Sequence, residues 1–85
     1  MNYYKAVFWD YPRFNNAKAI RRFINENYNN NVFLWMMYRF LEFGRVVDTL
    51  EFFTIKDISN NLPKIKLSDY SRNKWNRMIE VYGIK

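Results

Sequence analysis

Apolar residues concentrate in one stretch near the middle of the chain, from Val32 to Gly44. Before the glycine only Arg39 and Glu42 carry charge, and every other residue is apolar or aromatic. A helix that is apolar on almost all sides must be buried on almost all sides. At about 1.5 Å per residue this stretch is under about 20 Å long, whereas a bilayer core is roughly 30 Å thick. The pattern therefore predicts the central helix of a small soluble domain.

A second helix is predicted over residues 16–28, because its apolar residues recur every three or four positions. Asn15 or Asn16 is its expected N-cap, since an asparagine oxygen can accept from the free amides of the first turn. The stripe that would face the core comprises Ile20, Phe23, Ile24 and Tyr28. The basic residues on the outer faces are either solvated or in contact with phosphate: Lys18, Arg21 and Arg22.

Gly44 would end the central helix in the left-handed conformation that glycine adopts easily. The next helix would start at Asp48, because Asp48 and Glu51 have the three-residue spacing of a capping box. It would run to about residue 53. Its inward side would carry Val47, Leu50 and Phe53.

Two more helices complete the predicted order. Thr54 is expected to cap a helix over residues 55–62, whose apolar side consists of Ile55, Ile58 and Leu62. Ser68 would cap the last helix, which ends at Gly83. The packing face of that helix would hold Trp75, Met78, Ile79 and Tyr82.

Residues 3–12 precede these helices and end in an aromatic run before Pro12. Because a proline disfavours helix at the preceding residue, this segment is predicted to be an extended arm or a single turn, anchored by Phe8 and Trp9. Residues 1–85 are long enough for one core only. The predicted fold is thus a single all-α domain, a compact bundle of four or five short helices with an N-terminal arm.

The composition excludes several chemistries. The chain has no cysteine and no histidine, so it offers no thiolate nucleophile, no imidazole catalyst and no Cys/His zinc site. Two glycines cannot make a glycine-rich phosphate loop, and the eight carboxylates are not paired at metal-ligand spacing. We therefore expect a non-enzymatic protein without metal or cofactor. With no cysteine and no visible signal peptide, it is expected to be cytoplasmic and not to enter a membrane.

The net charge of +6 indicates either an acidic partner or simple solubility. Basic residues exceed acidic ones near both ends of the chain but not in the central stretch. On the last helix, one predicted exposed strip combines arginine and asparagine, the residue types that read guanine and adenine in the major groove. This strip consists of Arg72, Asn73, Asn76 and Arg77, and further phosphate contacts could come from Lys64, Lys66 and Lys74.

The last three predicted helices have the order of a helix-turn-helix unit, which makes DNA binding one functional hypothesis. The segment from Pro63 to Leu67, however, is longer than the usual turn of that motif. A protein partner or a homo-oligomer is the other hypothesis, because 18 aromatic residues are many for 85 residues to bury. The N-terminal arm would hold the surplus rings, unless they cover the core within the monomer: Tyr3, Tyr4, Phe8, Trp9 and Tyr11.

Three short motifs resemble a small bacterial family of domains of unknown function. They are Phe8-Trp9-Asp10, then Arg39-Phe40-Leu41-Glu42-Phe43-Gly44, and finally Leu67-Ser68 followed by Trp75. Members of that family are often encoded beside nucleotidyltransferase-type toxin genes. The resemblance therefore implies an antitoxin-like or regulatory accessory role, which is compatible with binding either DNA or a toxin.

The motif residues also have a physical interpretation. A charge on a buried helix needs a partner, because its desolvation is costly. Asp10 is the predicted partner of Arg39, and Arg45 that of Glu42. Together with Phe8, Trp9 and Gly44, these residues are expected to be structural and to tie the arm to the central helix.

Overall fold

The computed structural model describes residues 7–11, 14, 16–28 and 30–82. Five α-helices lie wholly within these ranges, and the ranges contain no strand. The elements are α2 (Ala17–Glu26), α3 (Asn31–Phe43), α4 (Val46–Phe52), α5 (Ile55–Asn61), the 3-10 helix η2 (Leu62–Lys64) and α6 (Asp69–Tyr82). The predicted all-α bundle is confirmed. No helix in the described part of the chain has the length and apolar character needed to cross a bilayer.

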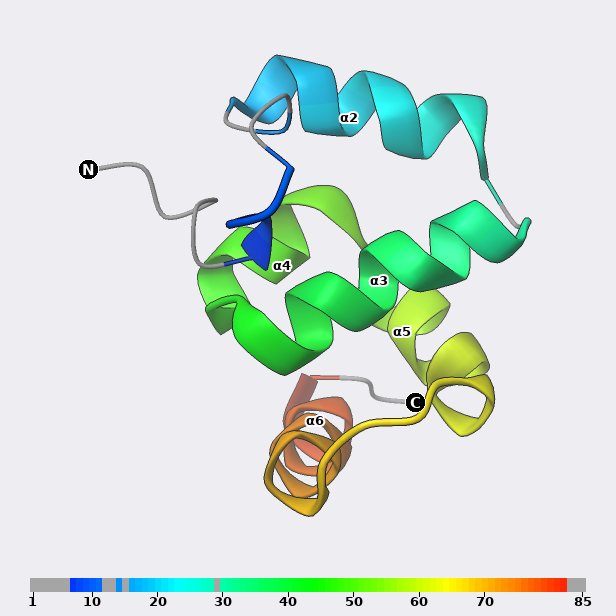
Figure 1. The fold of residues 1–85 in the computed structure, drawn as a ribbon. Helices are drawn as coiled ribbons and strands as arrows, with labels where there is room; N and C mark the ends of the chain where they lie inside the picture. Colours follow the sequence, from blue (N-terminus) through cyan, green and yellow to red (C-terminus); the bar gives the residue numbers. More distant parts are fainter. Residues whose placement is uncertain (1–6, 12–13, 15, 29, 83–85) are drawn as a thin grey trace.

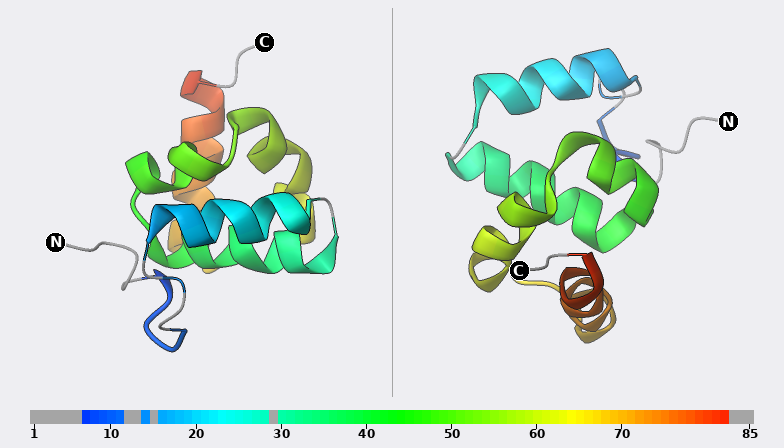
Figure 2. Two further views of the ribbon diagram at one scale, coloured as in Figure 1. Left: turned by 90° about the horizontal axis from the view of Figure 1, so that it is seen from above. Right: turned by 180° about the vertical axis from the view of Figure 1, so that it is seen from behind.

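Helix α3 is the centre of the bundle, as its composition predicted. In Figures 1 and 2, α2 lies alongside α3 and runs in the opposite direction, whereas α6 lies on the far side of α3. Helix α4 packs behind α3, and α5 packs against α6. The buried residues of α3 are Phe33, Met36, Met37, Arg39, Phe40 and Leu41.

Side-chain caps define where most of the helices begin. Asn16, rather than Asn15, caps α2, and its Oδ1 accepts from the amide of Ala19 at 2.9 Å. Asn30 caps α3 by accepting from two backbone amides. Thr54 and Ser68 cap α5 and α6 as predicted, with bonds of 3.0 and 3.2 Å from the amides three residues later. Each cap satisfies amides that would otherwise lack a partner.

The predicted start of α4 is wrong. The helix begins at Val46 and not at Asp48, because Asp48 does not cap it but accepts two hydrogen bonds from Arg45, at 2.8 and 3.1 Å. Val47 is 66% exposed, and Leu50 is also exposed, although both were predicted to face inward. Thr49 takes the inward position instead, and its Oγ1 donates to the carbonyl of Phe40 at 3.3 Å or of Arg45 at 2.9 Å.

Two tyrosines predicted to pack inward are exposed. Tyr82 lies in the last turn of α6, more than half exposed. Tyr28 lies beyond the end of α2, where its ring contacts Phe33 and its hydroxyl donates to Asp57 at 2.9 Å. Both residues extend the apolar spacing of their helices past the part that other elements cover. Periodicity alone therefore overestimated the buried face.

Gly44 is required for space and not for a left-handed backbone. Its φ is −94°, so the left-handed C′ prediction is wrong. A Cβ at this position would lie 2.9 Å from the Phe40 carbonyl oxygen and 3.1 Å from a methyl carbon of Val7. The missing side chain lets Val7, on the N-terminal arm, approach the end of α3.

We therefore predict that Gly44→Ala destabilises the fold by about 1–3 kcal/mol, the range for overpacking a close contact. Urea denaturation of the variant and the parent protein would measure the difference. In a Val7→Ala background the same substitution should cost less, because the close contact with the Val7 methyl carbon is relieved. Equal costs in both backgrounds would show that Val7 does not set the constraint.

Candidate binding surface around Arg39

Arg39 is a buried charge in the middle of the apolar helix α3, with 7% of its surface exposed. Its Nε donates to the carbonyl oxygen of Val7 at 2.9 Å, and its Nη2 donates to the carboxylate of Asp10. The predicted pair of Arg39 and Asp10 is thus confirmed. Both acceptors belong to the N-terminal segment, so this one side chain connects the arm to the centre of the bundle.

Aromatic rings surround the same guanidinium group. Its carbon lies 4.5 Å from the ring centroid of Trp9. The centroids of four other rings lie 5.6 to 5.7 Å from the same carbon, those of Phe8, Tyr11, Trp35 and Phe43. A cation near ring faces is stabilised by their quadrupoles, and the planar guanidinium can serve several rings at once. The arm and α3 therefore share a single cation–aromatic cluster.

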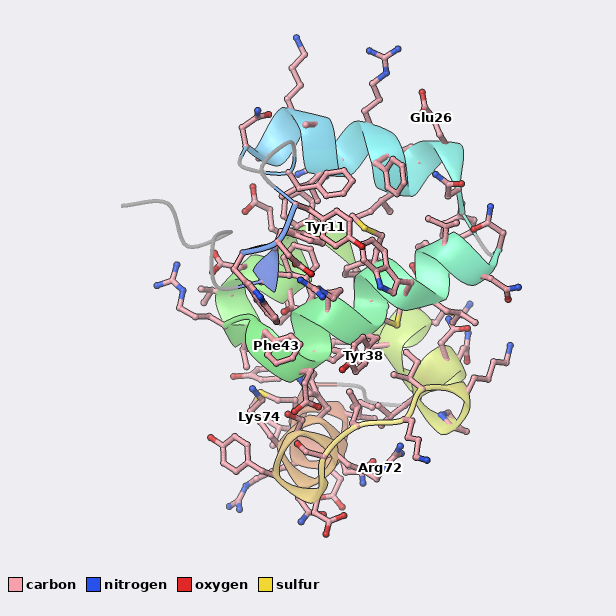
Figure 3. The ribbon with its side chains drawn as sticks, viewed as in Figure 1. Tyr11, Glu26, Tyr38, Phe43, Arg72 and Lys74 are labelled. Atoms are coloured by element: carbon pink, nitrogen blue, oxygen red, sulfur yellow. The ribbon has the colours of Figure 1, made fainter. Side chains whose placement is uncertain are left out.

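The outer side of this cluster is exposed. Trp9 is 60% exposed, Tyr11 40% and Phe43 39%, while Trp35 and Tyr38 are half-buried. Ring contacts link these residues, with centroid distances of 5.0 Å for Trp9–Phe43, 5.2 Å for Tyr11–Trp35 and 6.1 Å for Tyr38–Phe43. We call these five residues the aromatic patch. Figure 3 shows Tyr11, Tyr38 and Phe43 on the same side of the molecule.

The aromatic residues of the arm were expected either to remain exposed or to cover the core, and each alternative holds for some of them. Phe8 is buried in the core, whereas Trp9 and Tyr11 remain exposed. Tyr3 and Tyr4 lie outside the described residues. Sequence reasoning missed the contribution of α3, because a helix that is apolar all round was expected to be covered all round. No signal in the pattern separates Tyr38 and Phe43 from their buried neighbours.

A groove adjoins the aromatic patch. Its volume is about 480 Å³, and its apolar lining consists of Leu34, Trp35, Tyr38 and Ile65. Lys64 and Lys66, predicted as phosphate contacts, also line it, and both are exposed. The groove shares Trp35 and Tyr38 with the aromatic patch, so the two form one continuous surface.

Glu42, the second charge of α3, was predicted to pair with Arg45, and this prediction is wrong. Its Oε1 accepts from the backbone amide of Ser68 at 3.0 Å, which connects α3 to the start of α6. Burial alone would raise the pKa of Glu42. Hydrogen bonds from Ser68 and Ser71 and the charge of Lys74 outweigh burial and hold that pKa below its usual value.

The predicted DNA-reading strip on α6 is not assembled as expected. Asn73, Asn76 and Arg77 are exposed, but Arg72 is half-buried and donates to the carbonyl of Ile65. Lys74 is half-buried as well, near the rings of Tyr70 and Trp75. The acidic residues on the exposed face of α6 are Asp69 and Glu80. Within α6, the exposed charges are therefore two negative and one positive.

The connection between α5 and α6 also differs from a tight turn. It consists of η2 followed by residues 65–68, which are extended or irregular. Seven residues thus separate the two helices, whereas a helix-turn-helix unit uses three or four.

The described residues contain no group of three or more acidic, cysteine or histidine side chains placed to hold a metal ion. Comparisons of the chain with protein-family models, curated proteins and solved structures found no match. The family resemblance and the roles that it implies therefore remain hypotheses.

We predict that Arg39→Ala lowers the free energy of unfolding by about 1–3 kcal/mol, the scale for losing a buried hydrogen-bonded charge. The Val7 carbonyl and the ring faces would lose their partner. Thermal and urea denaturation would measure the loss. Arg77→Ala, on the exposed face of α6, is the control and should change stability by no more than about 0.5 kcal/mol. An Arg39 variant as stable as the Arg77 variant would refute the structural role.

We also predict that the contribution of Glu42 to stability depends on pH. A carboxylate whose pKa is lower in the folded state stabilises the fold above its unfolded pKa, and this stabilisation is lost as pH falls through the folded pKa. The stability difference between the parent protein and Glu42→Gln should thus be largest near neutral pH and shrink on acidification. Urea denaturation over a pH series would measure it, with Glu80→Gln as an exposed control. A difference that grows toward low pH would contradict the sign.

Proposed function

We propose that this chain is a small non-enzymatic interaction protein that binds a protein partner, or a second copy of itself, through the aromatic patch. The observation that supports the proposal most directly is the exposure of Trp9, Tyr11 and Phe43, three large rings that are in contact with one buried cation. Exposing apolar rings to water raises the free energy, and covering them with a partner lowers it.

The rings of the patch are also held in place before any partner arrives. Trp9 contacts both Arg39 and Phe43, and Tyr11 contacts Trp35 edge-on. Tryptophan and tyrosine are enriched among the residues that dominate interface energies. Because their rotamers are already restricted, association would cost less side-chain entropy than it would for free rings.

The biological role that we propose is that of a cytoplasmic accessory protein, antitoxin-like or regulatory. This accessory role is supported by the resemblance of the Phe8-Trp9-Asp10 and Arg39–Gly44 motifs to the family described above. The same motifs supply the cation, its carboxylate partner and part of the aromatic patch. The motif that ties the arm to α3 and the binding surface would then coincide.

Duplex DNA binding by α6 has less support. Arg72 is engaged with the Ile65 carbonyl, and Asp69 and Glu80 lie on the exposed face of the helix. Carboxylates beside a strip that approaches phosphates repel them. The aromatic patch carries no such conflict with a protein partner.

Site-specific photocross-linking would test the proposed interaction. Phe43→p-benzoylphenylalanine places the photoreactive ring within the patch, and the host cell should be the organism that encodes the chain. We expect a discrete cross-linked product, either with another protein or with a second copy of this chain. Tyr70→p-benzoylphenylalanine is the matched control, because Tyr70 is an exposed aromatic residue on the outer face of α6.

Two results would contradict the proposal. One is the same set of cross-linked products from positions 43 and 70, which would indicate random contacts. The other is the absence of any product from position 43 while the protein is folded and expressed.

A further inference from the structure

We propose that the groove beside the aromatic patch binds an extended acidic segment of the partner, with carboxylates on Lys64 and Lys66 and an apolar side chain between Trp35 and Ile65. This inference rests on the proposed function and specifies the chemistry of the partner. The groove and the patch share Trp35 and Tyr38, so one ligand could cover both.

The apolar part of the groove suits a side chain of moderate size. Among its lining residues Ile65 is buried, and Leu34, Trp35 and Tyr38 are half-buried. These residues come from α3 and from the connection before α6, which are joined by the bond from Ser68 to Glu42. A hydrogen bond therefore joins the two segments that line the groove, α3 and the connection before α6.

The charge of the groove is of one sign. Lys64 and Lys66 form no ion pair within the described part of the chain, and none of the lining residues is acidic. The guanidinium of Arg72, bonded to the carbonyl of Ile65, adds a third positive charge nearby. Complementary charge speeds encounter and discriminates against basic partners. A segment rich in aspartate and glutamate fits this arrangement.

The backbone of the connection favours an extended ligand. Ile65 has extended dihedral angles, φ −107° and ψ 131°, and residues 66 and 67 belong to no helix or strand. The amide and carbonyl of Lys66 form no backbone hydrogen bond within the described residues. An extended peptide could therefore add main-chain hydrogen bonds here, as peptides do at exposed strand edges.

A single-stranded nucleic acid fits this surface less well. Bases bind by stacking on free aromatic faces. The Arg39 guanidinium already lies over the Trp35 ring, and Tyr38 packs at right angles against Phe43. The acidic residues Asp69 and Glu80, on the outer face of α6, give a phosphate backbone no further support.

The test uses the full chain and a fluorescein-labelled peptide of alternating glutamate and leucine, followed by fluorescence anisotropy. We expect saturable binding that weakens with salt. Lys64→Glu combined with Lys66→Glu should weaken binding by at least about tenfold, which corresponds to about 1.4 kcal/mol. Lys18→Glu combined with Lys56→Glu is the matched control, because it changes the net charge equally at exposed positions outside the groove. This control should retain most of the affinity.

A second pair of substitutions, an NMR measurement and a control peptide complete the experiment. Lys64→Gln with Lys66→Gln repeats the test if the charge-reversed protein fails to fold, as judged by circular dichroism. The indole NMR signal of Trp35 should shift on peptide addition, because Trp35 lines the groove. A peptide of alternating lysine and leucine should not bind.

Three results would overturn the proposal. They are no saturable binding of the acidic peptide, equal weakening by both double variants, and tighter binding of oligothymidylate that depends on the same two lysines. If photocross-linking at Phe43 still yields a partner in any of these cases, the interaction function stands and only the acidic chemistry of the ligand is wrong. If cross-linking fails as well, the proposed function is wrong.

Discussion

The fold depends on satisfying one charge, that of Arg39, inside a helix that is otherwise apolar. Removing a guanidinium from water is costly unless acceptors replace the lost hydration. Here the acceptors are the carbonyl of Val7 and the carboxylate of Asp10, both from the N-terminal segment. Burying α3 and docking the arm are therefore coupled. Gly44 completes the arrangement, because the space of its missing side chain is where Val7 approaches the helix.

The same coupling produces the surface on which our functional proposal rests. Rings that stabilise the buried cation must lie close to it, yet this contact occupies only one side of each ring. Trp9 and Tyr11 consequently present their outer sides to solvent, beside Phe43 on α3. The described residues thus contain a stable core whose edge is a preorganised aromatic patch, and the lysines of the adjoining groove give that edge a positive rim.

The helices and several caps could be predicted from the sequence because they depend on local chemistry. Apolar spacing located α2 and α6, and Thr54 and Ser68 satisfy amides only three residues away. The pairing of Arg39 with Asp10 was also predictable, since a buried charge needs a partner and Asp10 is the acidic residue of the arm. The prediction of a capping box at Asp48 was wrong. Arg45 lies within reach on the same turn and pairs with Asp48, which leaves the Glu42 carboxylate to accept from Ser68.

The sequence by itself determined the number and order of the helices, the central position of α3 and the need for a partner to Arg39. These properties follow from periodicity, capping and the cost of burying charge, all of which act within a few residues or on one side chain. Only the tertiary structure decided which faces stay open. Exposure of Val47, Tyr38 or Phe43 depends on which elements lie over them, and hydropathy is the same for a covered and an uncovered ring. For that reason the candidate surface lies at the edge of the apolar helix and not on the basic strip of α6 that the pattern of charges favoured.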